Sequence, residues 1–440
     1  MKRGYEFLAI ASLLMCALFT APVSRAQQQT VLSGEARSQV SDMLRTAYNE
    51  VKKHYYDPKF QGLDWDARYQ QYAARIPNAR DLGEGYRVVA AFLSGLKDSH
   101  TFFAPPERAA RYDSGYRFAL IGNNCFITEV RPKTDAESKL HIGDQVLNMN
   151  GYSVDRGDFH DVEYYFGVLS PQMSLTFNLR SPSGESRQAV VNASVRPVKR
   201  TVDLTQGNDY YDLVRRGENE DQVERTRFVE VGDATIVKLS QFDQDIDDVD
   251  KIMGTARKHK TLILDLRGNP GGAIQSLELM VGALFDHDIK ISDPMGKNKN
   301  KPMIAKHHGR TFDGKVIVLV DAGSASCSEL LARVIQLEHR GTVIGDNSAG
   351  AVMEARYYSE TEGADSIILY GLSVTEDNLI MSDGKSLEKT GVVPDELVLP
   401  TGADLAAGRD PVLARAVELA SGKLDPVEAG KLFPFEWLPL

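Results

Sequence analysis

Residues 316–337 read VIVLV-DAGSASCSE-LLARVIQL, and this order of residue types predicts a buried strand, a tight turn and a helix. Ser326 falls where the helix begins, and the unpaired backbone N–H groups there can stabilise a developing oxyanion. A purely structural reading is also open, because Ser326 and Glu329 fit the S-x-x-E capping box. This stretch alone is therefore compatible with a nucleophilic serine or with a well-capped helix.

A second junction of the same kind lies at residues 261–272, which read TLILDLRGNPGG. The adjacent Gly271 and Gly272 let the backbone approach a ligand closely and turn N–H groups toward it. A phosphate-binding loop is excluded, because the stretch has neither a Gly-Lys-Ser/Thr ending nor a G-x-G-x-x-G pattern. Strands and helices alternate on both sides of these junctions, which predicts an α/β core with helices packed on a largely parallel sheet.

Pattern changes along the chain divide it into five parts. These are a signal peptide at 1–26, a helical N-terminal region at 27–112, a β-rich module at 113–200, a charged connection at 201–227 and the α/β core at 228–440. Two basic residues precede a short apolar run, and Ser24 and Ala26 are small residues suited to a cleavage site. We therefore expect export to the periplasm or the extracellular space, without stable membrane insertion after signal removal.

Composition excludes several classes of function. The net charge of −10 argues against nucleic-acid binding, which requires a basic face. Apart from Cys16 in the predicted signal peptide, the cysteines are Cys125 and Cys327, which fall in different predicted domains, so a disulfide framework is not indicated. His307 and His308 have no further ligands at metal-binding spacing, and we predict neither a metal nor a cofactor. The oligomeric state stays open.

Three motifs occur in an order that resembles the tail-specific, or C-terminal processing, serine peptidases. They are DLRGNPGG at 265–272, SASCSE at 324–329 and GVVPD at 391–395. The run IGDQVLNMNG at 142–151 resembles that family's PDZ domain. This resemblance implies a crotonase/ClpP-like α/β peptidase core in which Ser326 is the nucleophile. It also implies an oxyanion hole built from the Cys327 N–H together with that of Gly271 or Gly272.

The sequence departs from the better-known branch of that family, which activates its serine with a lysine 25 residues downstream. Ala351 occupies that position, and residues 341–384 contain no lysine. His100, preceded by Ser99, is similar to the histidine of the tricorn-core branch, which pairs serine with histidine and a glutamate. Glu388 lies just before the GVVPD motif, where that glutamate is found, and Glu354 is its rival.

The resulting hypothesis is an exported serine endopeptidase that acts on unfolded or flexible polypeptides. His100 removes the proton of Ser326 and later delivers it to the leaving amine. We expect activity to fall as the pH drops through roughly 6 to 7, where an ordinary histidine protonates. In the PDZ-like module, Tyr116, Arg117 and Phe118 are predicted to bind peptide. Two alternatives are a catalytically inactive peptide-binding scaffold and a binder of small apolar ligands on the same fold.

Overall fold

The computed structural model describes residues 32–108, 110–197, 225–298, 300–362 and 368–437. The predicted signal peptide and all but the last three residues of the predicted charged connection lie outside these ranges. Among the described helices, none combines the length and apolar character needed to cross a bilayer.

The core is built on a six-stranded sheet that is parallel except for its first strand. Its strands, in spatial order, are β10 (Arg227–Val231), β11 (Ala234–Lys238), β12 (Thr261–Asp265), β15 (Lys315–Val320), β16 (Gly341–Gly345) and β19 (Glu396–Leu397). The central strands are runs of buried apolar residues, as expected for a parallel sheet that is covered on both faces.

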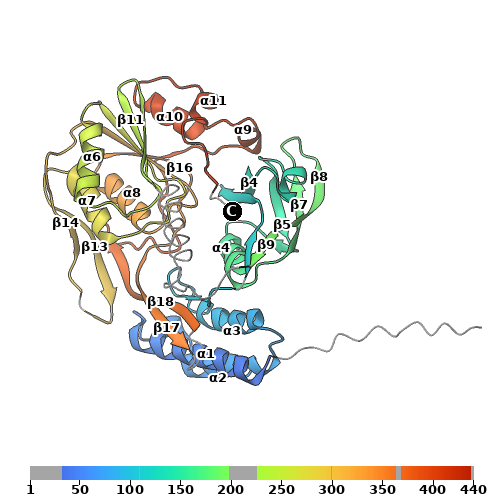
Figure 1. Cartoon of the computed structure of the whole chain (residues 1–440). Coiled ribbons are helices and arrows are strands. Elements are labelled where there is room, and N and C mark those ends of the chain that lie inside the picture. Colours follow the sequence, from blue (N-terminus) through green and yellow to red (C-terminus); the bar gives the residue numbers. More distant parts are fainter. Residues whose placement is uncertain (1–31, 109, 198–224, 299, 363–367, 438–440) are drawn as a thin grey trace, which may run out of the picture.

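Helices cover both faces of this sheet (Figure 1). One face packs against α6 (Ile246–Ala256), α7 (Ile274–Leu284) and α8 (Cys327–Leu337), and the other against α10 (Pro411–Leu419) and α11 (Pro426–Ala429). Alternate strand residues face the two layers, so that Val316 and Val318 join the first cluster while Ile317 joins the second. The predicted α/β core is therefore confirmed as a three-layer arrangement.

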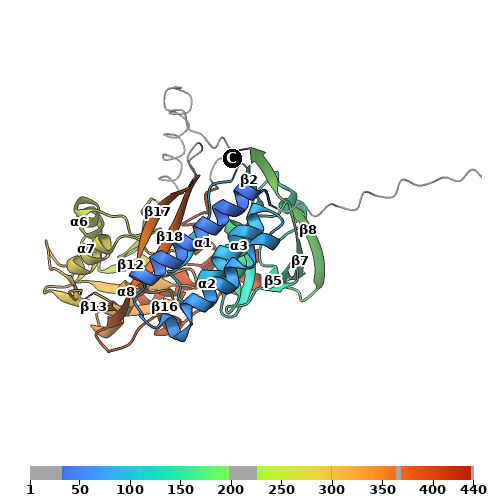
Figure 2. The ribbon, with the colours of Figure 1, turned by 90° about the horizontal axis from the view of Figure 1, so that it is seen from below.

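A second sheet connects the core to the N-terminal helices. Its strands are β1 (Phe102–Ala104), β13 (Ile289–Gly296), β14 (Met303–Ala305), β17 (Met353–Glu362) and β18 (Ile368–Met381). The helices α1 (Gly34–His54), α2 (Trp65–Ala73) and α3 (Leu82–Ser94) share one apolar cluster with β18, in which α1 packs on β18 and α3 on β1. Figure 2 shows α1 to α3 side by side, with the β17–β18 pair next to α1. Because β1 pairs with β18, the segment between α3 and β1 is held beside the core.

The β-rich module, residues 113–197, forms a separate antiparallel sheet with its own apolar cluster. The sheet contains β3 (Tyr116–Ile121), β4 (Asn124–Val130), β5 (Gln145–Met149), β6 (Tyr152–Ser153), β7 (Ser174–Arg180) and β8 (Ser186–Asn192). Two short helical segments, α4 (Phe159–Glu163) and η4 (Tyr164–Leu169), complete it, and β9 (Ser194–Pro197) pairs with β2 (Ala110–Asp113). β3 is an edge strand of this sheet, which leaves one side of its backbone outside the ladder.

The β-rich module packs directly on the core next to the turn that follows β15. Ala322 of this turn belongs to the apolar cluster of the module. Gly143 and Gly402 lie so close that a Cβ on Gly143 would come within 2.2 Å of the Gly402 carbonyl oxygen. Arg156 forms an ion pair of 2.7 Å with Asp346, at the end of β16. The module is therefore in contact with the loops that surround Ser326.

Candidate active site

Ser326 lies in the turn between β15 and α8 with an unusual backbone conformation. Its φ is +53° and its ψ is −117°, whereas a serine that only caps a helix has an extended backbone. A positive φ in a residue other than glycine is costly and persists only where surrounding contacts hold it. Here the Ser326 N–H donates to the Ala351 carbonyl over 2.9 Å and to Glu329 Oε2 over 3.1 Å. The Ser326 side chain stays partly exposed at the tip of this strained turn.

Glu329 is completely buried behind the Ser326 turn and does more than cap α8. Besides the Ser326 N–H, its carboxylate accepts hydrogen bonds from the Ser348 hydroxyl and from the N–H groups of Gly350 and Ala351. Burial raises the pKa of Glu329 to about 7, and these hydrogen bonds oppose that rise. The same carboxylate thus joins the Ser326 turn to the 348–351 loop.

The glycine pair packs against the serine turn. A Cβ on Gly271 would lie 2.7 Å from the Cβ of Ser326, so only glycine fits there. The Gly271 N–H donates to Asn269 Oδ1 over 2.8 Å and can serve as an oxyanion donor only if this bond opens or is shared. The Cys327 thiol donates to the Gly272 carbonyl over 3.4 Å. Gly271, Gly272 and Cys327, the predicted oxyanion donors, therefore meet beside Ser326.

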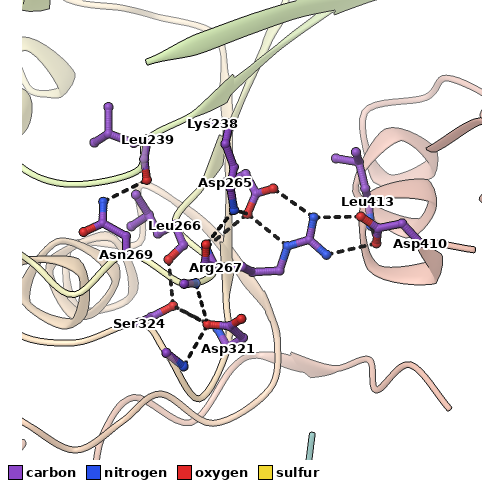
Figure 3. Close-up of polar contacts among 12 residues, drawn as sticks. Lys238, Leu239, Asp265, Leu266, Arg267, Asn269, Asp321, Ser324, Asp410 and Leu413 are labelled. Atoms are coloured by element: carbon purple, nitrogen blue, oxygen red, sulfur yellow. Dashed lines mark hydrogen bonds and ion pairs between the residues drawn. The ribbon is translucent and has the colours of Figure 1, made fainter. Parts of the chain in front are cut away.

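A network of charges fixes the glycine-containing turn (Figure 3). Arg267 donates to Asp265 over 2.9 and 2.8 Å and to Asp410, at the start of α10, over 2.9 and 2.8 Å. Burial acts to raise the pKa of Asp265, but Arg267 and Lys238 outweigh it and hold this pKa well below its usual range. The turn is thereby attached to the central sheet through Asp265 and to the α10–α11 helix layer through Asp410.

Asp321 joins the two turns. Its Oδ1 accepts from the Gly268 N–H over 2.8 Å and from the Gly323 N–H over 2.9 Å. The Ser324 hydroxyl adds a bond of 2.8 Å to the Leu266 carbonyl, also drawn in Figure 3. The relative position of the two turns is therefore set by side chains that do not themselves face the nucleophile.

His100, Ser99 and Glu388 form a hydrogen-bonded series. The Ser99 Oγ lies 2.7 Å from His100 Nδ1 and 2.8 Å from Glu388 Oε2. Glu388 also accepts from the Ser99 N–H over 2.9 Å, so that both the position and the hydroxyl of Ser99 are constrained. Burial raises the pKa of Glu388, against the effect of its hydrogen bonds.

The surroundings of His100 favour its neutral form. Burial lowers the pKa of His100 below the ordinary 6.5, and the negative charge of Asp98 opposes this shift. Asp98 Oδ1 also accepts hydrogen bonds from the N–H groups of His100 and Thr101 and from the Thr375 hydroxyl on β18. The loop between α3 and β1 is therefore held against the second sheet.

Ala351 and Val352 connect this series to the serine turn. The Ala351 carbonyl accepts from the Ser326 N–H, and the next N–H, that of Val352, donates to Glu388 Oε2 over 3.0 Å. Ser326 and Glu388 are thus bound to adjacent residues of one extended segment. The structure therefore places Ser326 and the Ser99–His100–Glu388 series on either side of Ala351, the residue that stands at the sequence position of the lysine.

Other residues named from the sequence lie elsewhere. Glu354 is on β17 opposite Asp377, and the carboxylate that contacts Ser99 is that of Glu388. His307 and His308 each bond to a backbone carbonyl through one ring nitrogen. In the described ranges, no group of three or more histidine, cysteine, aspartate or glutamate side chains is placed to hold a metal ion.

The predicted peptide-binding residues are on the edge strand β3. The rings of Tyr116 and Phe118 turn into the β-rich module, where they contact Phe177 and Phe159. Arg117 is exposed on the opposite side of the strand. Peptide contact by Tyr116 and Phe118 would therefore run through their backbone at the sheet edge.

The two free thiols are unsuited to nucleophilic work. Cys125 and Cys327 are both buried. Burial raises the pKa of Cys327 to about 11, so its thiolate is scarce at neutral pH. The predicted role of Cys327 therefore depends on its backbone N–H, next to Ser326, and not on its thiol.

Sequence reasoning missed several supporting residues. Asp98 lies two positions before His100, but an acidic residue in a loop carries no signal by itself. Glu329 was visible only as half of a capping box. Arg156 and Asp346 are 190 positions apart, and no spacing pattern predicts such a pair.

Comparison with known proteins finds two family models that match parts of this chain. A family model described as peptidase family S41 matches residues 233–398, and one described as the tricorn protease C1 domain matches residues 37–92. The chain is 24% identical over 393 residues to carboxyl-terminal-processing peptidase 3, chloroplastic, of Arabidopsis thaliana, which covers 85% of this chain and 70% of that protein.

Two further similarities extend over most of the chain. It is 25% identical to putative tricorn protease homolog 2 of Streptomyces coelicolor, over 86% of this chain and 32% of that protein. The crystal structure of mature CPAF has the same fold, with a TM-score of 0.64 and 14% identity, over 84% of this chain and 94% of that chain. The chain contains a peptidase family S41 domain and is related to the C-terminal processing peptidases.

Proposed function

We propose that this S41 peptidase hydrolyses peptide bonds with Ser326 as nucleophile and His100 as general base. The observation that carries the proposal is the hydrogen-bonded series from His100 through Ser99 to Glu388, which adjoins the strained Ser326 turn through Ala351 and Val352. Ala351 stands where the lysine-dependent branch of the family has its lysine. The Ser99–His100–Glu388 series therefore supplies the base that the site otherwise lacks. The match of the N-terminal helices to the tricorn protease C1 domain supports assignment of the chain to the tricorn-core branch, which uses a histidine.

The hydrogen bonds also suggest which nitrogen of His100 acts. An ionised Glu388 can only accept, so the Ser99 hydroxyl donates to it and its oxygen accepts from His100 Nδ1–H. The lone pair of His100 is then on Nε2. This nitrogen takes the proton from Ser326 Oγ as that oxygen attacks the substrate carbonyl carbon, and it returns the proton to the leaving amine nitrogen. Water, deprotonated by the same nitrogen, then hydrolyses the acyl-enzyme.

The tetrahedral intermediate carries a negative charge that needs donors. The Cys327 N–H at the start of α8 is one, and the N–H of Gly271 or Gly272 is the other. The Gly271 N–H already faces Asn269 Oδ1, which favours Gly272 unless the substrate draws Gly271 away. The ion pairs between Arg267 and two aspartates would keep this turn in place during the reaction.

The substrates we propose are unfolded or flexible polypeptides outside the cytoplasm. The N-terminal sequence motivates export, and the family acts on polypeptides. The β-rich module is proposed to be PDZ-like, with the edge of β3 available for an added strand. Its contact with the loops around Ser326 gives bound peptide a direct route to the site.

Hydrolysis of an unfolded protein such as reduced casein separates the proposal from its alternatives. The chain should cleave casein, whereas Ser326→Ala and His100→Ala should not, and all three should bind it. Binding that is unchanged in Ser326→Ala, without cleavage by the parent chain, would indicate a scaffold. Saturable binding of a fatty acid or retinoid without peptide turnover would indicate a carrier of small apolar ligands.

A further inference from the structure

An aromatic segment after α11 bridges the core and the β-rich module. We call residues Phe433–Trp437 the aromatic strap. At its first residue, the Phe433 ring packs with the α10–α11 layer and lies 5.5 Å from the Arg227 guanidinium. Arg227 also donates to the Pro434 carbonyl over 2.9 Å. Figure 1 shows this part of the chain leaving the core and ending beside β4.

The other residues of the strap lie on two arginines of the β-rich module. The Arg117 guanidinium is 5.1 Å from the centre of the Phe435 ring, and the Arg131 guanidinium is 4.6 Å from that of Trp437. The two rings also contact each other edge to face, with centres 5.0 Å apart. Glu436, between them, pairs with Arg225 over 3.0 Å. Phe435 and Trp437 are two positions apart and each takes one arginine.

The two arginines form a surface of their own. Arg117 is on β3, Arg131 directly follows β4, and the N–H of Arg131 bonds to the Gly115 carbonyl beside β3. Asp113 holds the Arg131 guanidinium over 2.9 Å. The surface therefore presents two positioned cations to the faces of aromatic rings. It is distinct from the sheet edge, because Arg117 points away from the Tyr116 and Phe118 rings that pack inside the module.

These contacts suit reversible docking. Arginine–aromatic contacts at exposed positions are individually weak, and Phe435 remains 37% exposed. The strap stays on the surface because it belongs to the same chain, which gives it a high effective concentration. A polypeptide with the same arrangement of rings can compete with it from solution.

We propose that Arg117 and Arg131 form a docking surface for extended polypeptides with aromatic residues at alternate positions, and that the aromatic strap occupies this surface in cis. Docking in trans requires the strap to leave. A substrate segment bound there would lie on the same module that contacts the Ser326 turn. The inference concerns binding alone and does not depend on the proposed chemistry of Ser326 and His100.

Fluorescence anisotropy with a labelled peptide, Lys-Leu-Phe-Pro-Phe-Glu-Trp, tests the proposal in a Ser326→Ala background that does not cleave the probe. Replacing both Phe435 and Trp437 by alanine in the protein should vacate the surface and tighten peptide binding at least tenfold. Adding Arg117→Ala to that variant should reverse the gain, and a peptide in which the second phenylalanine and the tryptophan are replaced by alanine should not bind. Equal affinity in the vacated and the parent chain, or no effect of Arg117→Ala, would overturn the proposal.

A second measurement covers the case in which the double variant does not fold. In the parent chain, Arg117→Gln should loosen the strap and speed cleavage by added chymotrypsin after Phe435 at least threefold. The matched control is Arg415→Gln, which breaks ion pairs of α10 with Glu396 and Glu418 that are remote from the strap. An unchanged rate in Arg117→Gln, or an equal increase in the control, would contradict the assignment.

Discussion

Glu388 holds Ser99 at two points, although the two residues are 289 positions apart: its carboxylate accepts from the Ser99 N–H over 2.9 Å and from the Ser99 hydroxyl over 2.8 Å. The hydroxyl so fixed lies 2.7 Å from His100 Nδ1. A serine placed between a histidine and a carboxylate can orient the ring and stabilise the imidazolium that forms when the ring takes a proton. Glu388 would thus act on His100 through Ser99.

The first prediction concerns this series. Glu388→Gln and Ser99→Ala should each lower kcat/KM on casein-derived peptides by roughly a hundredfold, because each leaves His100 without its oriented partner. The double variant should be no worse than either single variant, since both remove the same relay. Glu354→Gln is the control and should keep kcat/KM within about twofold of the parent value, since Glu354 lies on β17 opposite Asp377 of β18. An equal loss in Glu354→Gln would transfer the role to that carboxylate.

The second prediction concerns pH. His100 acts as a base only when neutral, so activity falls as the pH drops through its pKa. Burial lowers this pKa below 6.5, and the acid limb of kcat/KM should therefore lie below that of an exposed histidine. Asp98 opposes the shift, so Asp98→Asn should move the limb further down.

A surface carboxylate provides the control for this pH shift. Asp383→Asn removes a charge that pairs with Arg333 and should leave the acid limb where it is. A limb that moves upward in Asp98→Asn, or an acid limb of the parent chain that lies above that of an exposed histidine, would contradict His100 as the base.

The third prediction concerns stability. Glu329 has a pKa of about 7 in the folded chain and an ordinary 4.5 when unfolded, so between these values the folded state binds more protons. Its contribution to the free energy of unfolding is therefore fully present below pH 4.5 and declines as the pH rises through 7, by about 3 kcal/mol in all. Glu329→Gln should flatten this part of the profile, measured by urea unfolding from pH 5 to 8. A slope identical to that of the parent would show that Glu329 is not responsible.

The fourth prediction concerns the link between the β-rich module and the site. Arg156 pairs with Asp346 and donates to the carbonyls of Asn347 and Ser348, at the start of the 348–351 loop that Glu329 holds. Asp346 is buried, so Arg156→Ala leaves its charge without an ion-pair partner and should lower kcat/KM roughly tenfold. Arg415→Ala, which breaks an ion pair elsewhere, should not. Full activity in Arg156→Ala would mean that this contact only attaches the module.

The residues that could be predicted from sequence are those at junctions. Ser326, Gly271 and Gly272 follow apolar strands, and their small neighbours make each turn recognisable. The meeting of these turns with Ser99, His100 and Glu388 follows from pairing in the second sheet, above all β1 with β18. Such long-range pairing is not encoded in local spacing, and β17 and β18 were not predicted at all.

Other features lacked any local signal. Glu329 both caps α8 and binds the 348–351 loop, and the sequence predicts only the first role. The pattern of a capping box is the same whether or not the carboxylate also binds a neighbouring loop. The aromatic strap reads as a short segment after the last helix, and only the placement of Arg117 and Arg131 gives its rings a partner. Features of this kind arise from tertiary contacts between distant segments.

Labelling with a fluorophosphonate, followed by mass-spectrometric mapping, tests the central assignment most directly. The parent chain should carry the adduct on Ser326, and His100→Ala should carry none, while Ala351→Lys serves to ask whether a lysine can replace the histidine. An adduct on Ser326 that persists at an unchanged rate in His100→Ala, or no adduct in the parent chain, would contradict a nucleophile activated by His100.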